Sequence, residues 1–288
     1  MPDWTSFTPA ELPTLIVGRE IRFFLSVGST NDLLKEEARR GAAEGLVFVT
    51  DEQVAGRGRR GRSWTAPAGS SLLVSALFQP SWLPASSAFF MTILAAVAAA
   101  EAIEAVTALT VDLKWPNDLQ IGGQKLGGIL VETEMSDTQL HWTVIGCGIN
   151  VNWSPRAIPE LADIATSISA ELGRTIDRRA LLHALLTRLD ARYHLLRQGA
   201  RSALFDAWRG RLGTLGQTVR VETPNGPFLG VAEDVTLDGA LILRDERHRQ
   251  HLVNAGEVSI RPTKKNHERT PGKPGTGDNP PSEQENKA

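Results

Sequence analysis

The sequence lacks the features that mark secreted or membrane proteins. A single cysteine, Cys147, excludes a framework of intrachain disulfides and favours a reducing cytoplasm. Residues 1–12 carry acidic groups and no apolar h-region, so no signal peptide is evident. The longest nearly apolar run, residues 88–100, is well short of the ~20 residues that span a bilayer. We therefore expect a cytoplasmic protein with no membrane partner, in which this run forms a buried, Ala-rich helix.

A large net charge and several catalytic motifs are also missing. A net charge of −2 and an aromatic content of 6% argue against bulk binding to nucleic acid. The histidines show no H-E-x-x-H spacing, so no zinc site is indicated. The chain has no Gly-x-Ser-x-Gly elbow and no Walker A motif, which removes support for serine hydrolysis and for a P-loop.

The 288 residues are enough for one sizeable core and a smaller module. Periodicity and caps predict helices at 30–40, 86–106, 177–197 and 203–211, and strands at 46–52, 71–78, 129–134 and 141–151. This mixture of elements occupies a predicted domain at 21–213, after a short lead-in at 1–20.

Composition changes after residue 213. Short β segments are predicted at 218–222, 228–232, 241–243 and 257–260, with turns at 224–226 and 238–239. Closely spaced turns and short strands favour a small barrel at 214–261 over βαβ units. Residues 262–288 contain five prolines and no large apolar residue, so we expect a disordered tail.

The most conspicuous local segment is the Gly/Arg run at 56–64. Glycines let the backbone curl close to a ligand, and arginine forks suit phosphate and carboxylate oxygens. Four arginines within six positions should repel one another unless an anion is present. A solvated basic loop or an Arg-Gly contact to nucleic acid would give the same pattern, so the run alone does not decide the function.

A second segment, Lys-Trp-Pro-Asn-Asp-Leu at 114–119, puts an amide and a carboxylate on a bend set by Pro116. The amide of Asn117 could read an adenine edge, and the carboxylate of Asp118 could hold Mg²⁺ or accept a proton. An ordinary turn between two strands would look the same. Lys125, after the Gly pair at 122–123, would in isolation be a solvated lysine.

The third segment is Gly-Cys-Gly-Ile-Asn at 146–150, inside an apolar strand. Paired glycines there indicate either a ligand or another backbone packed close, or a bulge in a core strand. Cys147 is expected to pack as a small hydrophobic residue and is given no chemistry.

The order and combination of these segments closely resemble the biotin protein ligases. The resemblance covers about 20–261 and rests on Ser29-Thr30-Asn31, Gln53 ahead of the 56–64 run, the 114–119 box, 125–130 and Gly148-Ile149-Asn150. It implies an α+β, class II synthetase-like catalytic domain with a mixed sheet and packed helices, followed by a small SH3-like β-barrel. It also implies the monofunctional class, without an N-terminal DNA-binding domain.

The activity implied is ATP-dependent. Biotin and ATP form biotinyl-5′-AMP, and biotin is then transferred to a lysine of a biotin carboxyl carrier protein. Mg²⁺ would come with ATP and bridge the leaving pyrophosphate. The partners implied are biotin, ATP and the carrier protein, with no nucleic acid and with room for a homodimer.

The resemblance also implies site residues. Biotin-binding candidates are Ser29, Thr30, Asn31, Gln53, Gly56, Arg57, Arg59 and Lys125. Candidates for ATP or adenylate are Arg59, Arg62, Trp64, Asn117 and Asn150. Candidates for catalysis are Arg57, Arg59, Lys114, Lys125 and Asp118, the last to orient or deprotonate the acceptor amine.

Two rivals stay open at this point. A lipoate ligase would use similar adenylating chemistry, but lipoate lacks the ureido group that Ser29, Thr30 and Gln53 are expected to pair. A nucleic-acid-binding module using the Arg-Gly loop should show basic patches beyond it and interleaved aromatics.

Overall fold

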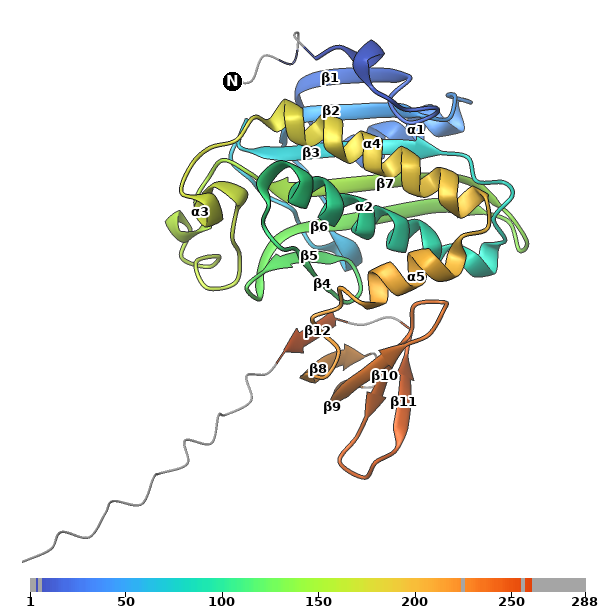
Figure 1. The fold of residues 1–288 in the computed structure, drawn as a ribbon, viewed down its shortest axis with the longest axis vertical. Coiled ribbons are helices and arrows are strands. Elements are labelled where there is room, and N and C mark those ends of the chain that lie inside the picture. The colour runs from blue at the N-terminus through green and yellow to red at the C-terminus, as the bar shows by residue number, and fades with distance from the viewer. Residues whose placement is uncertain (1–3, 5–6, 224–225, 255–256, 261–288) are drawn as a thin grey trace, which may run out of the picture.

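The computed structural model describes residue 4 and residues 7–223, 226–254 and 257–260, in a larger and a smaller part (Figure 1). The strands of the larger part are β1 (Glu20–Val27), β2 (Leu46–Gln53), β3 (Ser71–Phe78), β4 (Asp112–Lys114), β5 (Asp118–Ile121), β6 (Gln124–Met135) and β7 (Leu140–Asn150). Its α-helices are α1 (Thr30–Arg39), α2 (Phe89–Thr107), α3 (Ile168–Leu172), α4 (Arg178–Arg197) and α5 (Arg201–Arg209). The smaller part has β8 (Thr218–Thr223), β9 (Gly226–Val235), β10 (Leu241–Arg244), β11 (Gln250–Val253) and β12 (Glu257–Ile260).

The central sheet of the larger part is mixed. Its seven strands run in the order β1-β2-β3-β7-β6-β5-β4, with β1 and β2 parallel and the other neighbours antiparallel. The expected α+β class with a mixed sheet is therefore confirmed.

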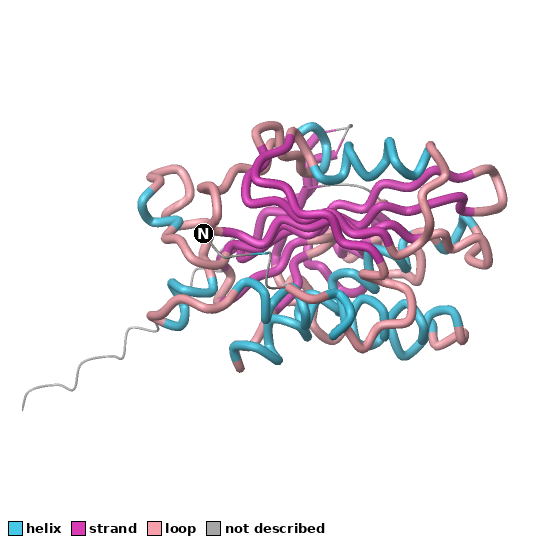
Figure 2. Tube along the Cα trace, turned by 90° about the horizontal axis from the view of Figure 1, so that it is seen from above, coloured by secondary structure: helices cyan, strands magenta, loops and turns pink. Residues whose placement is uncertain are grey.

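Helices cover both faces of this sheet, which makes three layers (Figure 2). One face carries α1, whose Leu34 and Ala38 pack with Phe48 of β2 and Leu77 of β3. The other face carries α2, α4 and α5, as the front layer of Figure 1 shows. All of β3 is buried. A strand covered on both faces needs apolar residues in nearly continuous order, which is how 71–78 reads.

Helix α2 lies in the core. It is long and apolar enough to cross a membrane by length and composition, but its residues are mostly buried against the sheet and α4. Its many alanines let α4 approach closely, since small side chains leave room between helix axes. The expectation of a buried, Ala-rich helix is confirmed.

The lead-in before residue 20 packs on the larger part. Trp4 is buried, and its indole N–H donates to Asp51 Oδ1 at 3.0 Å. The carboxylate of Asp190 in α4 accepts three backbone N–H groups, from Leu15, Ile16 and Val17, at 2.8 to 2.9 Å. Backbone donors that have no strand partner are thus satisfied by one buried side chain.

Several elements were not predicted. β1 is an edge strand whose exposed and half-buried residues follow no regular alternation, so periodicity misses it. β4, β5 and α3 have three, four and five residues, too few for a periodic signal. β6 begins five residues before the predicted 129, because Gly127 and Gly128 stay in the strand.

The smaller part is a five-stranded antiparallel sheet in the order β11-β10-β9-β8-β12. Its core is formed by Val219, Val221, Ala232, Leu241 and Leu243. Four of its strands match predicted segments, and β11 was not predicted. Residues 224–225 of the predicted turn and the tail at 262–288 lie outside the described residues.

Candidate active site

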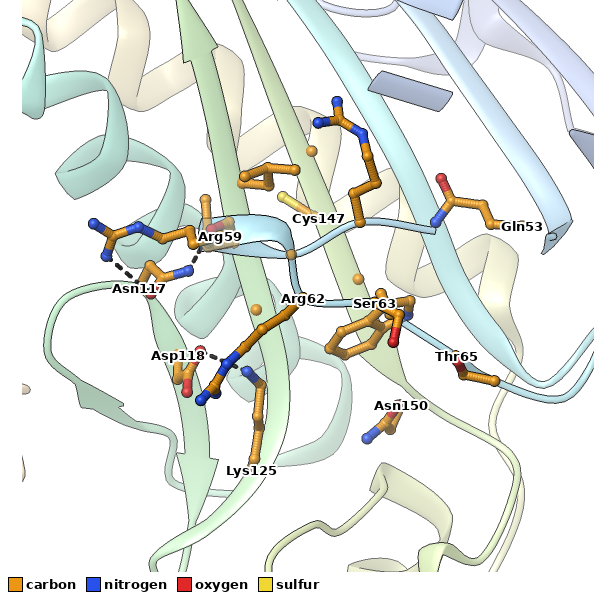
Figure 3. Close-up of a pocket in the computed structure, with 18 of the residues that line it drawn as sticks. Gln53, Arg59, Arg62, Ser63, Thr65, Asn117, Asp118, Lys125, Cys147 and Asn150 are labelled. Carbon is orange, nitrogen blue, oxygen red and sulfur yellow. Dashed lines mark hydrogen bonds and ion pairs between the residues drawn. The ribbon is translucent and has the colours of Figure 1, made fainter. Parts of the chain in front are cut away.

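A cavity of about 510 Å³ opens between the 56–64 run, strands β5 to β7 and the corner where the end of β2 meets the start of α1 (the β2–α1 corner). With one exception, every candidate residue from the sequence lines it. Figure 3 shows Gln53, Arg59, Asn117, Asp118, Lys125 and Asn150 around the cavity, although they come from segments far apart in the chain. The exception is Gly56.

The β2–α1 corner forms one end of the cavity. Ser29 is the N-cap of α1, and its hydroxyl accepts from Asp32 N at 3.4 Å. Gln53 Oε1 accepts from both Thr30 N, at 2.8 Å, and Thr30 Oγ1, at 3.1 Å. These bonds satisfy a free donor of the first helical turn and fix the Gln53 amide at the cavity wall. Ser29, Thr30 and Gln53 are the residues that we expect to pair with a ureido group, and the structure brings their hydroxyl and amide groups together here.

Asn31, a biotin-binding candidate from the sequence, makes hydrogen bonds that join α1 to strands β3 and β6. Its amide donates to Leu130 O at 3.2 Å and to Glu132 Oε2 at 2.9 Å, and its Oδ1 accepts from Ser75 Oγ at 2.6 Å. A Cβ at Gly146 would lie 2.2 Å from Asn31 Oδ1, so only glycine leaves room there. Asn31 therefore holds α1 to the sheet under the cavity.

The 56–64 run is a closed hairpin. Trp64 N donates to Gly56 O at 2.9 Å, Gly58 N donates to Arg62 O at 2.7 Å, and a β-bridge joins Arg57 to Ser63. A Cβ at Gly56 would lie 2.4 Å from the Trp64 carbonyl oxygen. Gly56 is thus required by close backbone approach, away from the cavity wall where we expected it.

Arg57 is paired with two carboxylates that the sequence analysis did not single out. Its guanidinium donates to Asp32 through Nε at 2.9 Å and Nη2 at 2.6 Å, and to Glu132 through Nη2 at 2.8 Å. Lys35 Nζ joins the same carboxylates, at 2.7 Å from Glu132 Oε1 and 2.9 Å from Asp32 Oδ1. Two cations and two anions form one cluster. Our premise that the loop arginines need a bound anion is wrong for Arg57.

Burial lowers the pKa of Arg57, but hydrogen bonds and charge from Glu132 and Asp32 outweigh it, so the pKa is raised. Glu132 shows the reverse balance. Burial works to raise its pKa, and hydrogen bonds from Lys35, Asn31 and Arg57 lower it overall. Both groups therefore stay charged at neutral pH.

Arg59 has a different environment. Its Nη1 lies 3.4 Å from Asn117 Oδ1, a long contact, and no ion pair joins it to a carboxylate of the described residues. Burial and the neighbouring charge of Arg60 lower the pKa of Arg59, with Asp118 opposing. A half-buried guanidinium without an ion-pair partner is costly to desolvate, so a bound anion at this point would be stabilised.

Lys125 and Asp118 face each other across the β5–β6 hairpin (Figure 3). Lys125 Nζ lies 2.7 Å from Asp118 Oδ1 and 5.9 Å from the centre of the Trp64 ring. The backbone of Lys125 is held on both sides, with its N–H on Ile164 O and its carbonyl on Thr166 N. This lysine is fixed in the cavity wall, unlike the solvated lysine that its position alone would allow.

The β4–β5 bend carries the other groups of the 114–119 box. Asn117 Nδ2 donates to Ile129 O at 2.7 Å, which orients its amide. Lys114 and Arg62 also line the cavity, and both make further contacts within the protein. Trp115 is buried and also lines the cavity.

Trp64 lies against β7. A Cβ at Gly148 would be 2.8 Å from Trp64 Cε2, so the glycine makes room for the indole ring. The paired glycines of 146–150 thus leave room for Asn31 and Trp64 of this chain. Both glycines also line the cavity, so a ligand packed close to them stays a prediction. Asn150, next along the strand, donates to Thr166 O at 3.0 Å, while its Oδ1 has no partner among the described residues.

One wall of the cavity was missed by sequence reasoning. Residues after β7 return along β6 and contribute Trp153, Ile158, Glu160, Leu161 and Ala165. These residues have no regular secondary structure period, so no local signal points to them. Cys147 also lines the cavity, and burial raises the pKa of its thiol to about 12. The thiol is protonated at neutral pH, in agreement with the inert role predicted for it.

The fold and cavity are those of a ligase that activates a small carboxylic acid. Residues 23–150 match the Biotin/lipoate A/B protein ligase family, and residues 214–261 match the Biotin protein ligase C terminal domain. Over the described residues, no group of three His, Cys, Asp or Glu side chains could hold a metal ion.

Individual relatives show which branch of the biotin/lipoate ligase family this chain resembles. The chain is 35% identical over 245 residues to the bifunctional ligase/repressor BirA of Bacillus subtilis, covering 85% of this chain and 75% of that protein. It is 35% identical over 246 residues to the biotin–[acetyl-CoA-carboxylase] ligase of Mycobacterium tuberculosis, covering 83% and 88%. The structure resembles a biotin protein ligase from Aquifex aeolicus in complex with biotin and ATP, with a TM-score of 0.72, 27% identity, and 85% and 100% coverage. The chain belongs to the biotin protein ligase family.

Proposed function

We propose that this protein forms biotinyl-5′-AMP from biotin and ATP and transfers the biotinyl group to a lysine of a biotin carboxyl carrier protein. The observation that carries the proposal is the arrangement of the cavity, which has fixed hydroxyl and amide groups at one end and cations beside an open amide acceptor at the other. Relatives named as biotin ligases support the choice of acid.

In the first step the biotin carboxylate attacks the α-phosphorus of ATP, and pyrophosphate leaves. Ser29, Thr30 and Gln53 pair with the ureido group, which is costly to bury without partners. Lys125 lies between this end of the cavity and the nucleotide end, and with Arg59 it offsets the repulsion between two anions as they meet. Lys114 and Arg62 add positive charge along the path of the phosphates.

The nucleotide base is placed by β7 and the 56–64 run. Asn150 Oδ1, which has no partner among the described residues, accepts from the adenine amino group. Asn117, on the other side of the cavity, is the second amide that we assign to the nucleotide. Trp64 supplies the flat apolar surface on which the base packs.

Mg²⁺ is part of this proposal through ATP. The cavity is lined by two carboxylates, Asp118 and Glu160, and by cations that suit phosphate, a donor set that fits Mg²⁺ carried on phosphate oxygens rather than a dedicated protein cage. The ion would neutralise charge on the leaving pyrophosphate.

In the second step the acceptor lysine attacks the carbonyl of the mixed anhydride, and AMP leaves. The amine must be neutral to attack, and Asp118 accepts its proton or orients it. The Asp118 carboxylate is held by Lys125 Nζ at 2.7 Å, which fixes its position in the cavity wall. We place this reaction in the cytoplasm, with no nucleic-acid or membrane partner, and a homodimer is compatible with it.

The direct test is pyrophosphate release on mixing the protein with ATP, Mg²⁺ and biotin, with lipoate as the matched control. With ATP and Mg²⁺ present, we expect pyrophosphate release with biotin and none with lipoate. Biotin should also raise the melting temperature, since a ligand that binds only the folded state stabilises it. Release and stabilisation with lipoate instead of biotin would contradict the substrate assignment.

A further inference from the structure

The base of the 56–64 hairpin is tied to the body of the protein by charge. Arg57, on the first leg of the hairpin, forms ion pairs with Asp32 of α1 and Glu132 of β6. Because the two legs are joined by backbone hydrogen bonds from Gly58 and Trp64, fixing Arg57 fixes the hairpin.

Glu132 is the centre of this tie. Its two oxygens accept from Arg57, from Lys35 and from the amide of Asn31. One carboxylate thus joins the hairpin to α1 and to the side chain beneath the cavity floor. The Glu132 side chain is 22% exposed and that of Arg57 37%, so solvent ions can reach this ion pair.

The remaining loop charges would open the hairpin without such a tie. Arg59 and Arg60 are adjacent in the chain, and Arg60 adopts a left-handed conformation with φ 57°. Like charges at this spacing repel, and a non-glycine residue in that region is strained. The cluster at Arg57 offsets both effects at the point where the hairpin leaves the sheet.

We propose that Glu132, together with Asp32, is a positioning residue that acts through Arg57 to hold the 56–64 hairpin over the cavity and so keeps the activated acyl-adenylate inside. The adenylate half of this statement rests on the proposed function. The ion pairs of Arg57 with Asp32 and Glu132, which we call the latch, are present without ligand and can be tested without any substrate.

The first experiment is limited tryptic cleavage of the ligand-free protein, followed by mass spectrometry at the loop arginines. Glu132→Gln is compared with Glu134→Gln as a matched control. Glu134 lies two residues on in β6, on the same face of the strand, and pairs with Arg39 at 3.9 Å. Among the described residues, no hydrogen bond or ion pair joins Glu134 to the 56–64 hairpin. We expect cleavage within 56–64 to speed up about three- to tenfold in Glu132→Gln and to stay unchanged in Glu134→Gln. Equal rates in both variants would overturn the latch.

The second experiment measures how the adenylate divides between transfer and escape. With biotin, ATP and carrier protein present, Glu132→Gln should raise the labelling of added serum albumin, relative to carrier labelling, by a similar factor. Added salt should raise the same ratio in the parent protein and leave Glu132→Gln almost unaffected.

A double-variant comparison separates positioning from a general loss of stability. If Glu132 acts through Arg57, the pair Arg57→Gln and Glu132→Gln should leak no more than Arg57→Gln alone. Additive effects, or a lower melting temperature with unchanged leakage, would refute the proposal. Asp32→Asn, at a more exposed carboxylate, repeats the test if Glu132→Gln unfolds at the assay temperature. Failure of the proposed function would show instead as no biotin-dependent pyrophosphate release in the parent protein, with the cleavage result intact.

Discussion

Lys125 shows how much a single residue can depend on its surroundings. Its ammonium group has a carboxylate at 2.7 Å and an aromatic face at 5.9 Å, and its backbone is bonded on both sides. In the proposed reaction, these contacts would hold one positive charge where the carboxylate and the α-phosphate meet. A charge held there before reaction needs no reorganisation in the transition state.

We expect Lys125→Ala to lower the single-turnover rate of adenylate formation by about 10²-fold or more, with the fold unchanged. The side chain is 38% exposed and contributes little to the core, so the melting temperature should hardly move. Lys125→Arg should recover part of the rate, because the charge returns with a different geometry. Near-normal adenylation by Lys125→Ala would remove this residue from the catalytic group.

Gly148 supports a second prediction at this scale. In Gly148→Ala the new Cβ would meet the Trp64 ring at 2.8 Å, whereas in Gly128→Ala, at the glycine paired with it across β6 and β7, the closest contact is an ordinary 3.6 Å. Overpacking of this kind costs about 1–3 kcal/mol. We expect Gly148→Ala to weaken ATP binding about ten- to a hundredfold, measured by calorimetry, with biotin binding much less affected. A larger loss in Gly128→Ala than in Gly148→Ala would show that the ring position is not what matters.

At the scale of elements, α4 does more than cover the sheet. Its N-terminal Arg178 is buried and bonds Asp51 Oδ1 at 2.6 Å and Ser71 O at 2.7 Å, and its guanidinium lies 5.0 Å from the centre of the Trp4 ring. Its Asp190 holds the backbone of the lead-in. The helix thus fastens the start of the chain onto strands β2 and β3.

The Asp190 contact gives an element-level prediction. Asp190→Ala leaves three backbone N–H groups without their acceptor, which should lower the free energy of unfolding by about 2–4 kcal/mol. Urea denaturation should show a lower midpoint, while adenylate formation at low temperature stays close to that of the parent. Asp206→Ala on α5, where no hydrogen bond from the lead-in ends, is the control, and an equal loss there would contradict the assignment.

At the scale of the whole molecule, the two parts are joined through the 114–119 box itself. Trp115 N donates to Thr214 Oγ1 at 2.9 Å, and its indole Nε1 donates to Gly239 O at 2.8 Å, in the turn between β9 and β10. The residue that begins the catalytic bend therefore also anchors the smaller part.

We expect Trp115→Phe to cost about 1–3 kcal/mol, because Gly239 O loses its partner and the ring shrinks. Trp208→Phe is the matched control, since Trp208 is equally buried but its Nε1 has no acceptor among the described residues. Limited proteolysis should release the smaller part sooner in Trp115→Phe than in Trp208→Phe. The reverse order would show that the junction is held elsewhere.

The same junction should respond to acid. A hydrogen bond from Arg209 lowers the pKa of Asp234 on β9, and at Glu104 hydrogen bonds from Arg211 and Val111 outweigh the opposing effect of burial and lower the pKa. A carboxyl whose pKa is lower in the folded state adds stability above its ordinary pKa, here 3.8 and 4.5, and loses it as the pH falls further. The melting temperature should hold from neutral pH to about 5 and fall below about 4.5. Asp234→Asn should make this fall shallower, and an unchanged acid profile would contradict the role of the pair.

Local chemistry in the sequence was sufficient for the main helices and for β2, β3 and β7, and the family resemblance carried by its motifs supplied site candidates that, apart from Gly56, all line the cavity. The reason is that caps, periodicity and the Gly/Arg, Lys-Trp-Pro-Asn-Asp and Gly-Cys-Gly-Ile-Asn segments carry their signals within a few neighbouring residues. Tertiary structure alone decided the partners. It paired Arg57 with Asp32 and Glu132, and it gave Gly146 and Gly148 to Asn31 and Trp64. These contacts join residues 25 to about 115 positions apart, and no local pattern encodes which distant charge or ring will meet which site.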